Sequence, residues 1–531
     1  MAKTKTYISL FSAAGIGCYG FKLEKYSCLA TVELLEKRLK IQKYNNICSK
    51  ESQYIQGDIA QKEILNDVFN QVKDGLKDAN QDKLDVVLAT PPCQGMSLAN
   101  HKKKNELPRN SLVIESLKII NQLKPNYFVF ENVPSFLKTI CFDIDKKNKS
   151  ISEAIQYNLG SEYIYISKKI NFAFYGSQSS RTRSLTIGVL KSLNIDPENL
   201  FPSEDDPKNL RELISHLPSL KWGEISSDIF HSFRTYQEHM RPWIKPLKEG
   251  MSAFQNKKPN QIPHRIINGK YHANQERNGD KYRRQIWDKL APCIHTRNDI
   301  LASQNTVHPK DDRVFSIREL MLMMTIPEKF KFTDIPSNKI SLFSNDEKKM
   351  FLKKEELNIR HCIGEAVPTN IFKKIAANIN QKVIRPKQDL KQKFSSFIDK
   401  TKVKNLNQLA NFINGTNSDL YSINDYQKFC ELLNTSKDDH AAFYTDQSIV
   451  DILVNSLPDF KEKKIIRILE PSVGSGNFIL ALVRKYFDKK ITIDVVDINK
   501  ESIDVLKAII KKTNLPKNVT INYINNDFLY E

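Results

Sequence analysis

The sequence predicts an α/β fold whose functional residues follow the ends of its strands. Three observations support this class: an apolar strand at 7–10 runs into a glycine-containing turn, and two more apolar runs at 85–89 and 127–130 each end abruptly in polar or proline-rich residues. Open α/β sheets bind their ligands beyond the carboxyl ends of the strands. We therefore expect the segments that follow these three strands to form the site.

The segment from Asp85 to Ser97 organises the chain. Its strand stops at Pro91 and Pro92, which lack amide donors and bias the backbone before them toward extended geometry. Cys93 follows at the tip of the loop, where its thiol can be presented to a ligand. The commoner fate of a free thiol is inert burial, and the loop by itself leaves both readings open.

The first strand leads into a turn that suits a nucleotide-like ligand. Gly15 and Gly17 allow the backbone to approach a cofactor where a side chain would collide. Glu33 stands at the end of a possible second strand, where a carboxylate can accept both ribose hydroxyl protons, and Asp58 can accept from an adenine amino group. Each acid alone is more typical of a turn or cap, so the ordered set is what favours a pocket.

Length and composition limit the classes of protein to which the chain can belong. The chain has 531 residues, enough for about two to four domains. Its 81 Lys and Arg exceed its 61 Asp and Glu and give a net charge of +20, which favours a polyanionic partner. We expect a cytoplasmic protein, because no apolar run approaches a membrane span and the N-terminus leads straight into a strand. The 8 cysteines include no Cys-x-x-Cys pair, so we expect neither a zinc site nor a disulfide framework.

Two motifs together indicate a family. Pro-Pro-Cys-Gln-Gly-Met-Ser at 91–97 resembles the catalytic loop of the C5-cytosine DNA methyltransferases, and Glu131-Asn132-Val133 resembles that family's partner motif. The resemblance spans roughly residues 5–380. It implies a Rossmann-like, S-adenosylmethionine-dependent methyltransferase fold with double-stranded DNA as substrate and no metal.

The resemblance also implies roles for individual residues. The implied catalytic residues are Cys93, Glu131, Arg181 and Arg183, and the implied cofactor-binding residues are Phe11, Ser12, Gly15, Gly17, Glu33, Asp58, Ile59, Pro91 and Val367. Four positions depart from the family pattern: Ser9 replaces Asp, Ala13 replaces Gly, Ser179 replaces Gln and Glu365 replaces Asn. Ala13 would widen the glycine turn, but neither Ser9 nor Ala13 removes a group that the chemistry needs. Ser179 replaces the Gln and leaves Arg181 and Arg183 intact.

Residues 191–312 differ from the rest of the chain in composition and periodicity. All three tryptophans and seven of the ten histidines lie there, among turn and basic residues with no dominant helical or strand period. Bases are read by hydrogen-bonding edges and stacking planes held on loops. We predict a target recognition domain at 191–312 inserted in a catalytic domain of 1–190 and 313–380, although a plain lid domain would look similar.

A second module follows residues 381–405, a Lys-rich stretch that we predict to be a linker or an exposed helix. Residues 406–531 again present a glycine turn, a ribose acid and an adenine acid, and resemble the first half of an N6-adenine DNA methyltransferase. The implied second cofactor site comprises Phe443, Tyr444, Glu470, Gly474, Gly476, Asp497 and Asp527. The Asn/Asp-Pro-Pro-aromatic tetrapeptide of such enzymes is missing, since the only Pro-Pro pair is Pro91-Pro92. We therefore expect adenine methylation only with a completing polypeptide.

The predicted activity is methyl transfer to C5 of a flipped-out cytosine in a specific DNA sequence. Such an enzyme would protect host DNA in a restriction-modification system that includes a cognate endonuclease. Two alternatives stay open. A related branch methylates tRNA cytosines through similar motifs, and the incomplete second module would also suit a non-catalytic DNA-specificity subunit of a two-activity complex.

Overall fold

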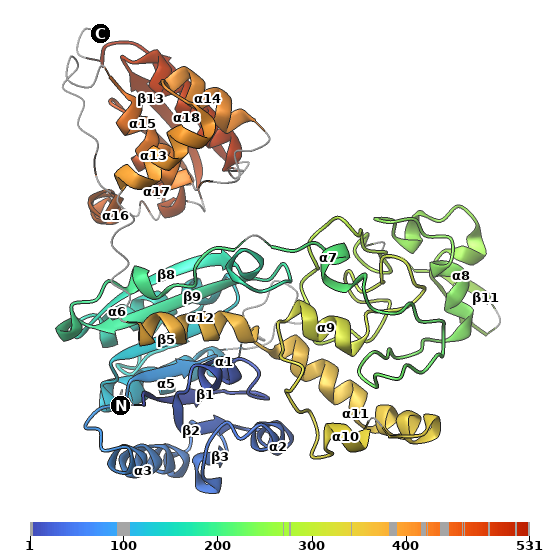
Figure 1. Ribbon diagram of the computed structural model, residues 1–531. Helices are drawn as coiled ribbons and strands as arrows, with labels where there is room; N and C mark the ends of the chain where they lie inside the picture. The colour runs from blue at the N-terminus through green and yellow to red at the C-terminus, as the bar shows by residue number, and fades with distance from the viewer. Residues whose placement is uncertain are drawn as a thin grey trace. The chain divides into compact units, whose positions relative to one another are not determined.

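The computed structural model describes residues 4–92, 107–381 and 390–528, except 206, 269, 275–277, 341, 416–420, 422, 436–444, 446, 459, 461, 487–488, 514 and 516–517. The chain divides into two compact units, Met1–Ile384 and Arg385–Glu531, which are described separately (Figure 1). The predicted nucleophile, Cys93, lies outside the described residues.

The first unit is built on a seven-stranded mixed sheet in the order β3-β2-β1-β4-β5-β9-β8. Strands β1 to β5 of this sheet run parallel, and β9 runs antiparallel to both of its neighbours. The strands are β1 (Thr6–Leu10), β2 (Ser27–Glu33), β3 (Tyr54–Gln56), β4 (Val86–Ala89), β5 (Tyr127–Asn132), β8 (Tyr163–Asn171) and β9 (Thr182–Leu190). The expected α/β class is confirmed, and the three strands predicted from apolar runs are β1, β4 and β5.

Helices cover both faces of this sheet, which is why its central strands are apolar on both sides. One core contains residues of α1 (Cys18–Leu23), α11 (Asn345–Glu365) and α12 (Thr369–Asn380), and the other contains residues of α3 (Lys62–Asp78), α5 (Leu112–Leu123) and α6 (Ile151–Leu159). The helix α2 (Glu36–Tyr44) follows β2. All five residues of β1 are buried, so the turn that follows β1 starts from a rigid position.

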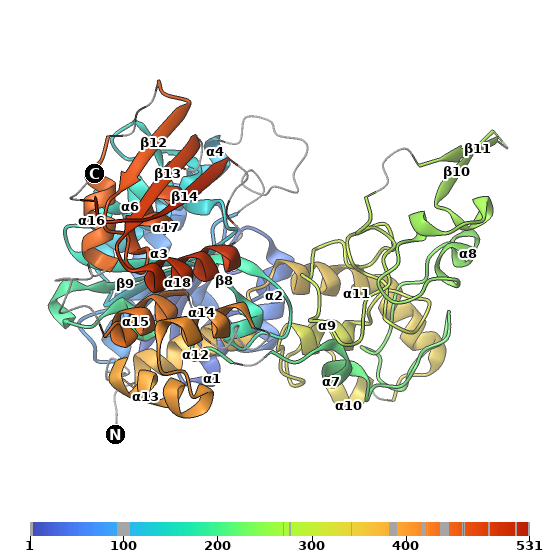
Figure 2. The ribbon, with the colours of Figure 1, turned by 90° about the horizontal axis from the view of Figure 1, so that it is seen from above.

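Regular elements are few and short between residues 191 and 312. The described part there holds α7 (Leu210–Ile214), α8 (Arg241–Ile244), the hairpin β10 (His264–Ile267) and β11 (Lys270–Ala273), and several turns of 3-10 helix. A separate small core forms around the buried Trp243. Figure 2 shows α8 and the hairpin at the end of the first unit away from the seven-stranded sheet. The chain then continues through α9 (Ile317–Met323) and α10 (Ser337–Ile340) into α11.

The second unit has a three-stranded parallel sheet in the order β12-β13-β14. Its strands are β12 (Ile465–Glu470), β13 (Lys490–Asp497) and β14 (Val519–Asn525), with α16 (Gln447–Ser456), α17 (Asn477–Lys485) and α18 (Lys500–Lys512) around them. A second cluster joins α18 to α13 (Leu390–Thr401), α14 (Leu406–Asn414) and α15 (Ile423–Leu433).

One segment differs from expectation. Much of the predicted linker at 381–405 is helix α13, whose Phe397 is completely buried in the core of the second unit. The many lysines of this stretch predict an exposed segment. Phe394 and Phe397, however, lie one helical turn apart and form an apolar side of the helix. Residues 390–401 are therefore part of the second unit.

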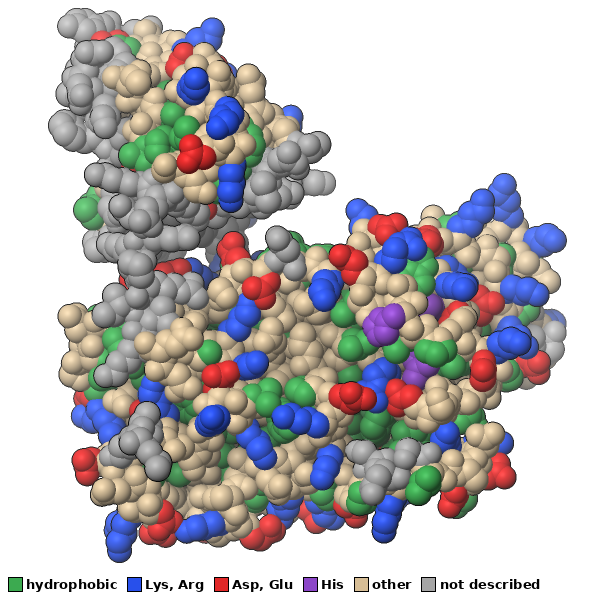
Figure 3. Space-filling model, viewed as in Figure 1, with side chains coloured by type: hydrophobic (Ala, Val, Ile, Leu, Met, Phe, Trp, Pro, Cys, Tyr) green, Lys and Arg blue, Asp and Glu red, His purple; other side chains and the backbone are tan. Residues whose placement is uncertain are grey.

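No helix in the described ranges is long and apolar enough to cross a membrane, and the described residues contain no cluster of His, Cys, Asp and Glu suited to a metal ion. On the face drawn in Figure 3, Lys and Arg side chains are spread over the surface with acidic residues between them, rather than gathered in one patch.

Candidate active site

The turn after β1 has a left-handed backbone at several positions. Phe11, Ala13 and Gly15 have φ values of 57°, 46° and 75°. The turn closes through the amide of Gly15, which donates to the carbonyl of Ser12 at 3.0 Å, and it is tied to β2 by the Ser12 amide, which donates to the Val32 carbonyl at 3.1 Å. Ala13, where the resembled family usually has Gly, therefore occupies a conformation that favours glycine.

Glu33 joins the turn to the end of β2. Its Oε2 accepts from the amide of Ala13 at 2.8 Å and its Oε1 accepts from the amide of Leu35 at 3.0 Å. Burial raises the pKa of this carboxyl, and the two backbone donors oppose the shift. Each oxygen keeps a second lone pair, so the group is held in place and can still accept from a ribose hydroxyl.

Asp58, the predicted adenine acid, lies at the next strand end. The Gly57 amide donates to the Glu33 carbonyl at 3.1 Å, which sets the segment after β3 beside β2. Asp58 is exposed, and its Oδ1 accepts from the amide of Ala60 at 3.0 Å. Ile59 is only 3% exposed and packs into the core. The sheet therefore brings Glu33 and Asp58 to the same edge, as parallel strands require.

The segment around Val367 closes against the glycine turn from far along the chain. A Cβ added at Gly17 would lie 3.2 Å from the Cβ of Val367, and the Thr369 hydroxyl donates to the Ile16 carbonyl at 2.9 Å. The Thr90 hydroxyl at the end of β4 donates to the Phe11 carbonyl at 2.9 Å. Three segments thus meet at one turn, and the residues present fit a nucleoside cofactor.

The start of the predicted nucleophile loop is fixed to the predicted partner motif. The Asn132 side-chain amide donates to the Pro91 carbonyl at 2.7 Å, in a buried position, and its Oδ1 accepts from the amide of Val133 at 2.9 Å. Pro91 is buried and lies two residues before Cys93. Pro91, the described start of the first motif, therefore meets the second motif at this hydrogen bond, which joins the segment after β4 to the last residue of β5.

Glu131 is a buried acid with an arginine beside it. The residue is 7% exposed, and its Oε1 lies 3.3 Å from Nε of Arg183. Among the described residues, no group donates a hydrogen bond to this oxygen. Burial raises the pKa of Glu131, while Arg183 and, less strongly, Arg181 lower it. The result is a carboxyl that burial biases toward the protonated form.

The two arginines have different surroundings. Nη1 of Arg181 donates to the carbonyls of Ile294 at 3.1 Å and Gly364 at 3.4 Å. This guanidinium therefore links the residue directly before β9 to two segments far away in the sequence. Arg183 is more open, and its Nη1 donates to the Thr182 carbonyl at 2.8 Å. His295, which the sequence did not single out, lies near both, and its pKa is lowered by burial and then by Arg181 and Arg183. No local pattern marks His295, because its neighbours come from more than a hundred residues away.

The turn of the second unit repeats that of the first. The Val473 amide donates to the Val496 carbonyl at 3.0 Å, as Ser12 does to Val32, and the Gly476 amide donates to the Val473 carbonyl at 2.8 Å, as Gly15 does to Ser12. Gly474 and Gly476 have φ values of 51° and 80°, close to those of Ala13 and Gly15. The same backbone turn is therefore built twice.

The acids repeat as well. Asp497 Oδ2 accepts from the amide of Gly474 at 2.8 Å and its Oδ1 accepts from the amide of Asn499 at 2.8 Å, which matches the two bonds of Glu33. The Asn526 amide donates to the Asp497 carbonyl at 3.2 Å and places Asp527 where the first unit has Asp58. Burial raises the pKa of Glu470, at the end of β12, to about 7.

Phe443 and Tyr444 lie outside the described residues, but the neighbouring Thr445 is described. Its carbonyl accepts from the Asn477 side chain at 2.9 Å, directly after the glycine turn. In the first unit the segment that meets the turn, around Val367, follows the sheet in sequence, whereas in the second unit it precedes the sheet. The two units thus use the same arrangement with a different chain order.

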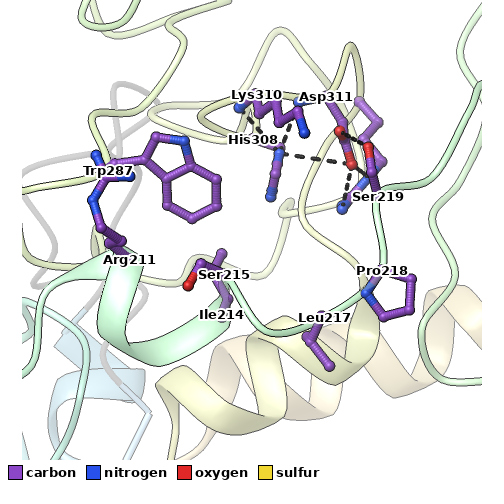
Figure 4. Close-up of a pocket in the computed structure, with 11 residues that line it drawn as sticks. Arg211, Ile214, Ser215, Leu217, Pro218, Ser219, Trp287, His308, Lys310 and Asp311 are labelled. Atoms are coloured by element: carbon purple, nitrogen blue, oxygen red, sulfur yellow. Dashed lines mark hydrogen bonds and ion pairs between the residues drawn. The ribbon is translucent and has the colours of Figure 1, made fainter.

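A cavity of about 250 Å³ lies elsewhere, in the region 191–312 and its border (Figure 4). Trp287 forms one wall. Nδ1 of His308 accepts from the amides of Lys310 at 3.2 Å and Asp311 at 2.9 Å, and the Ser219 hydroxyl donates to Asp311. Much of the polar lining is already engaged, and none of the predicted site residues borders this cavity.

Comparison with known proteins gives consistent matches. The family model described as C-5 cytosine-specific DNA methylase matches residues 5–381. The type II methyltransferase M1.HgaI of Avibacterium volantium is 32% identical over 394 residues, which cover 71% of this chain and 99% of that protein. The type II methyltransferase M1.HphI of Haemophilus parahaemolyticus is 28% identical over 332 residues, covering 62% and 79%. A solved structure of DNMT2 from Spodoptera frugiperda superposes with a TM-score of 0.42 at 14% identity, covering 71% of this chain and 100% of that one.

Proposed function

Since the chain belongs to the family of C-5 cytosine-specific DNA methylases, we propose which of its residues perform the reaction and what the second unit adds. The chain is a DNA cytosine-5-methyltransferase that uses S-adenosylmethionine. We assign the nucleophile to Cys93, the acid to Glu131 and a base contact to Arg183. The observation that carries this assignment is the hydrogen bond from Asn132 to Pro91, because it sets the start of the Cys93 loop beside the Glu131 strand.

The chemistry explains why a thiol and an acid are needed together. Carbon 5 of cytosine is a poor nucleophile, and addition of the Cys93 thiolate to carbon 6 makes carbon 5 enamine-like. The bound cofactor supplies an electrophilic methyl group on its sulfonium sulfur. Once carbon 5 carries the methyl group, a base removes its proton, the bond between sulfur and carbon 6 breaks, and the Cys93 thiolate is restored.

Glu131 suits the acid because burial raises its pKa. Thiolate addition places negative charge on the ring, and a carboxyl proton directed at N3 offsets it. Burial favours that proton, while Arg183 keeps the pKa from rising further. Arg183 is free to contact the O2 side of the base, and Arg181 takes a positioning role through its bonds to Ile294 and Gly364.

The cofactor-binding roles follow the strand ends. We assign the ribose to Glu33, the adenine edge to Asp58 and Ile59, and the adenine face to Phe11, with Ser12, Gly15, Gly17, Pro91 and Val367 shaping the pocket. The support is the meeting of three chain segments at the turn after β1 and the fixed carboxylate of Glu33.

The substrate base must leave the duplex, because neither face of carbon 6 is accessible in a stacked helix, and extrusion costs about a few kcal/mol. We assign recognition of the DNA sequence to residues 191–312, where aromatic and basic residues are held on loops. Because M1.HgaI and M1.HphI are named type II methyltransferases, we place the chain in a restriction-modification system with a cognate endonuclease.

We assign the second unit to an adenine methyltransferase half that binds S-adenosylmethionine. The repeated backbone bonds around Gly474, Gly476 and Asp497 support a second nucleoside site. A completing polypeptide would supply the tetrapeptide that holds the target amino group. An asymmetric DNA site has different bases on its two strands, so one cytosine and one adenine activity would protect both.

Sequencing of modified DNA tests these assignments. Bisulfite sequencing of DNA from cells that express the chain should reveal methylated cytosines in one sequence context, and Cys93→Ser should abolish them while DNA binding persists. Retained cytosine methylation in Cys93→Ser would refute the nucleophile. Adenine-sensitive sequencing of DNA from the native host should show adenine marks on the opposite strand of the same site, and cytosine marks confined to a palindrome would contradict the two-activity proposal.

A further inference from the structure

Helix α2, beside the cofactor turn, carries a buried arginine with a two-pronged ion pair. The side chain of Arg38 is 2% exposed. Its Nε donates to Oε2 of Glu365 at 3.0 Å and its Nη2 donates to Oε1 of the same residue at 3.1 Å. A bidentate pair of this kind fixes orientation as well as distance.

The third nitrogen fastens the same guanidinium to α11. Nη1 of Arg38 donates to Oδ1 of Asn358 at 2.5 Å and lies 2.9 Å from Sγ of Cys362. Asn358, Cys362 and Glu365 all belong to the last two turns of α11. One side chain therefore locks the end of α11 onto α2.

Both of these helices lead directly to the proposed cofactor site. On α2, one turn beyond Arg38, the Gln42 side-chain amide donates to Oγ of Ser12 at 2.8 Å and to the Ala13 carbonyl at 2.6 Å. At the end of α11, Glu365 precedes by two residues Val367, which packs against Gly17. The guanidinium thus couples the two supports of the glycine turn.

The pair also acts on the ribose acid. Arg38 lowers the pKa of Glu33 and Glu365 raises it, after the larger effects of burial and of the backbone donors. The two partners therefore oppose each other at Glu33, and removal of one would leave the other uncompensated.

We propose that Arg38 and Glu365 are a mutually dependent pair of positioning residues that holds the turn, Glu33 and the Val367 segment in the geometry that binds S-adenosylmethionine. This inference rests on the cofactor site assigned above, and neither residue is given a contact with the cofactor. In this chain Glu365 occupies the position where the resembled family usually has Asn. In the structure this acid, whose side chain is 37% exposed, faces the buried guanidinium of Arg38.

The proposal predicts that replacing Glu365 with the residue usual in the family impairs the protein. Glu365→Asn restores the residue usual in the family, yet it leaves a buried guanidinium without its carboxylate, which is more harmful than replacing both partners. We expect the KM for S-adenosylmethionine to rise about tenfold or more in Glu365→Asn. The kcat at saturating cofactor and the KM for DNA should stay near the wild-type values. The double variant Arg38→Gln/Glu365→Asn should recover most of the loss.

The control lies on the same helix. Glu36→Gln breaks the exposed pair between Glu36 and Lys40, whose charged atoms are 2.9 Å apart and whose side chains are 61% and 54% exposed. This variant removes one acidic charge from α2 but no buried partner, so the KM for the cofactor should stay unchanged. Loss in both Glu36→Gln and Glu365→Asn would mean that net charge, not pairing, sets the affinity.

A second readout is independent of turnover. Hydrogen exchange of the amides at 11–17 and 33–35, followed across a cofactor titration, reports binding at the first unit alone. The midpoint should shift to higher cofactor concentration in Glu365→Asn and return in the double variant. If Glu365→Asn does not fold, Arg38→Lys is measured instead, because lysine keeps the charge without the two-pronged geometry, and it should show the same rise in KM.

The outcomes separate the pair from the proposed function. An unchanged KM and midpoint in Glu365→Asn would overturn the positioning role, and so would an unchanged KM in Arg38→Lys where Glu365→Asn does not fold. A double variant at least as impaired as Glu365→Asn alone would overturn it as well. If the wild-type chain binds no S-adenosylmethionine at residues 11–17, the cofactor assignment itself fails.

Discussion

The hydrogen bond between Asn132 and Pro91 yields the sharpest prediction about the active site. Asn132→Asp keeps the shape of the side chain and the oxygen that accepts from Val133, but removes the donor to the Pro91 carbonyl. The residue is 3% exposed, so water cannot replace that donor. An unsatisfied buried carbonyl costs about 1–3 kcal/mol. A buried carboxylate facing it adds to this, and we expect a total loss of stability of about 2–4 kcal/mol at neutral pH.

The loss should also reduce catalysis, because the bond holds Pro91, two residues before the proposed nucleophile, against β5. We expect kcat/KM for cytosine methylation to fall about tenfold to a hundredfold, at about 1.4 kcal/mol for each factor of ten. Urea unfolding and methyl incorporation measure the two effects. Asn378→Asp is a control for the loss of a side-chain donor, because the partly buried Asn378 side chain donates to the Phe201 carbonyl at 2.8 Å, away from the predicted site. It should lose stability without losing activity.

The pH dependence gives an internal check on this reasoning. Burial raises the pKa of the introduced carboxyl, so its protonated form persists in the folded state and can donate to the Pro91 carbonyl. The stability deficit of Asn132→Asp should therefore be smallest at acid pH and should grow as pH rises through the raised pKa. A variant as stable and as active as wild type at pH 8 would refute the argument that this bond positions the loop.

Two further predictions concern single groups. Burial raises the pKa of Glu131, and we expect kcat to fall as pH rises through that pKa because the protonated form acts on N3. In Glu131→Gln the kcat should be about a hundredfold lower and should not change with pH. If this variant kept the pH dependence of the wild type, Glu131 would be excluded as the acid. In the second unit, Gly476 has a φ of 80°, and an added Cβ would lie 2.3 Å from Cδ1 of Leu506. Gly476→Ala should therefore destabilise that unit by about 1–3 kcal/mol and abolish cofactor binding there. Calorimetry should show the loss of one bound cofactor, while cytosine methylation continues.

Much of the first unit was predictable because its signals are local. Each apolar strand is followed directly in the sequence by the glycine, proline or acidic residues of the site. Because the strands are parallel, the residues that follow them lie at one edge of the sheet. The same local signals predicted the second turn, which the structure builds with the same backbone bonds around Asp497 as around Glu33. The Lys-rich composition of 381–405 predicts a linker or an exposed helix, and the burial of Phe397 in α13 could not be predicted because its partners meet it only in the folded unit.

The sequence by itself determined the kind of reaction and the groups available for it, since a nucleophile loop, an acid after a strand and a glycine turn are short motifs with their own geometry. Only the tertiary structure decided how those groups are held. Asn132 meets Pro91, Arg181 meets the carbonyls of Ile294 and Gly364, and Arg38 meets Glu365 across 327 positions of chain. These contacts have no period and no fixed spacing, because they form where separate helices and strands pack. That is why Glu365 looks like a departure in the sequence, whereas in the structure it is the 37% exposed partner of the buried Arg38.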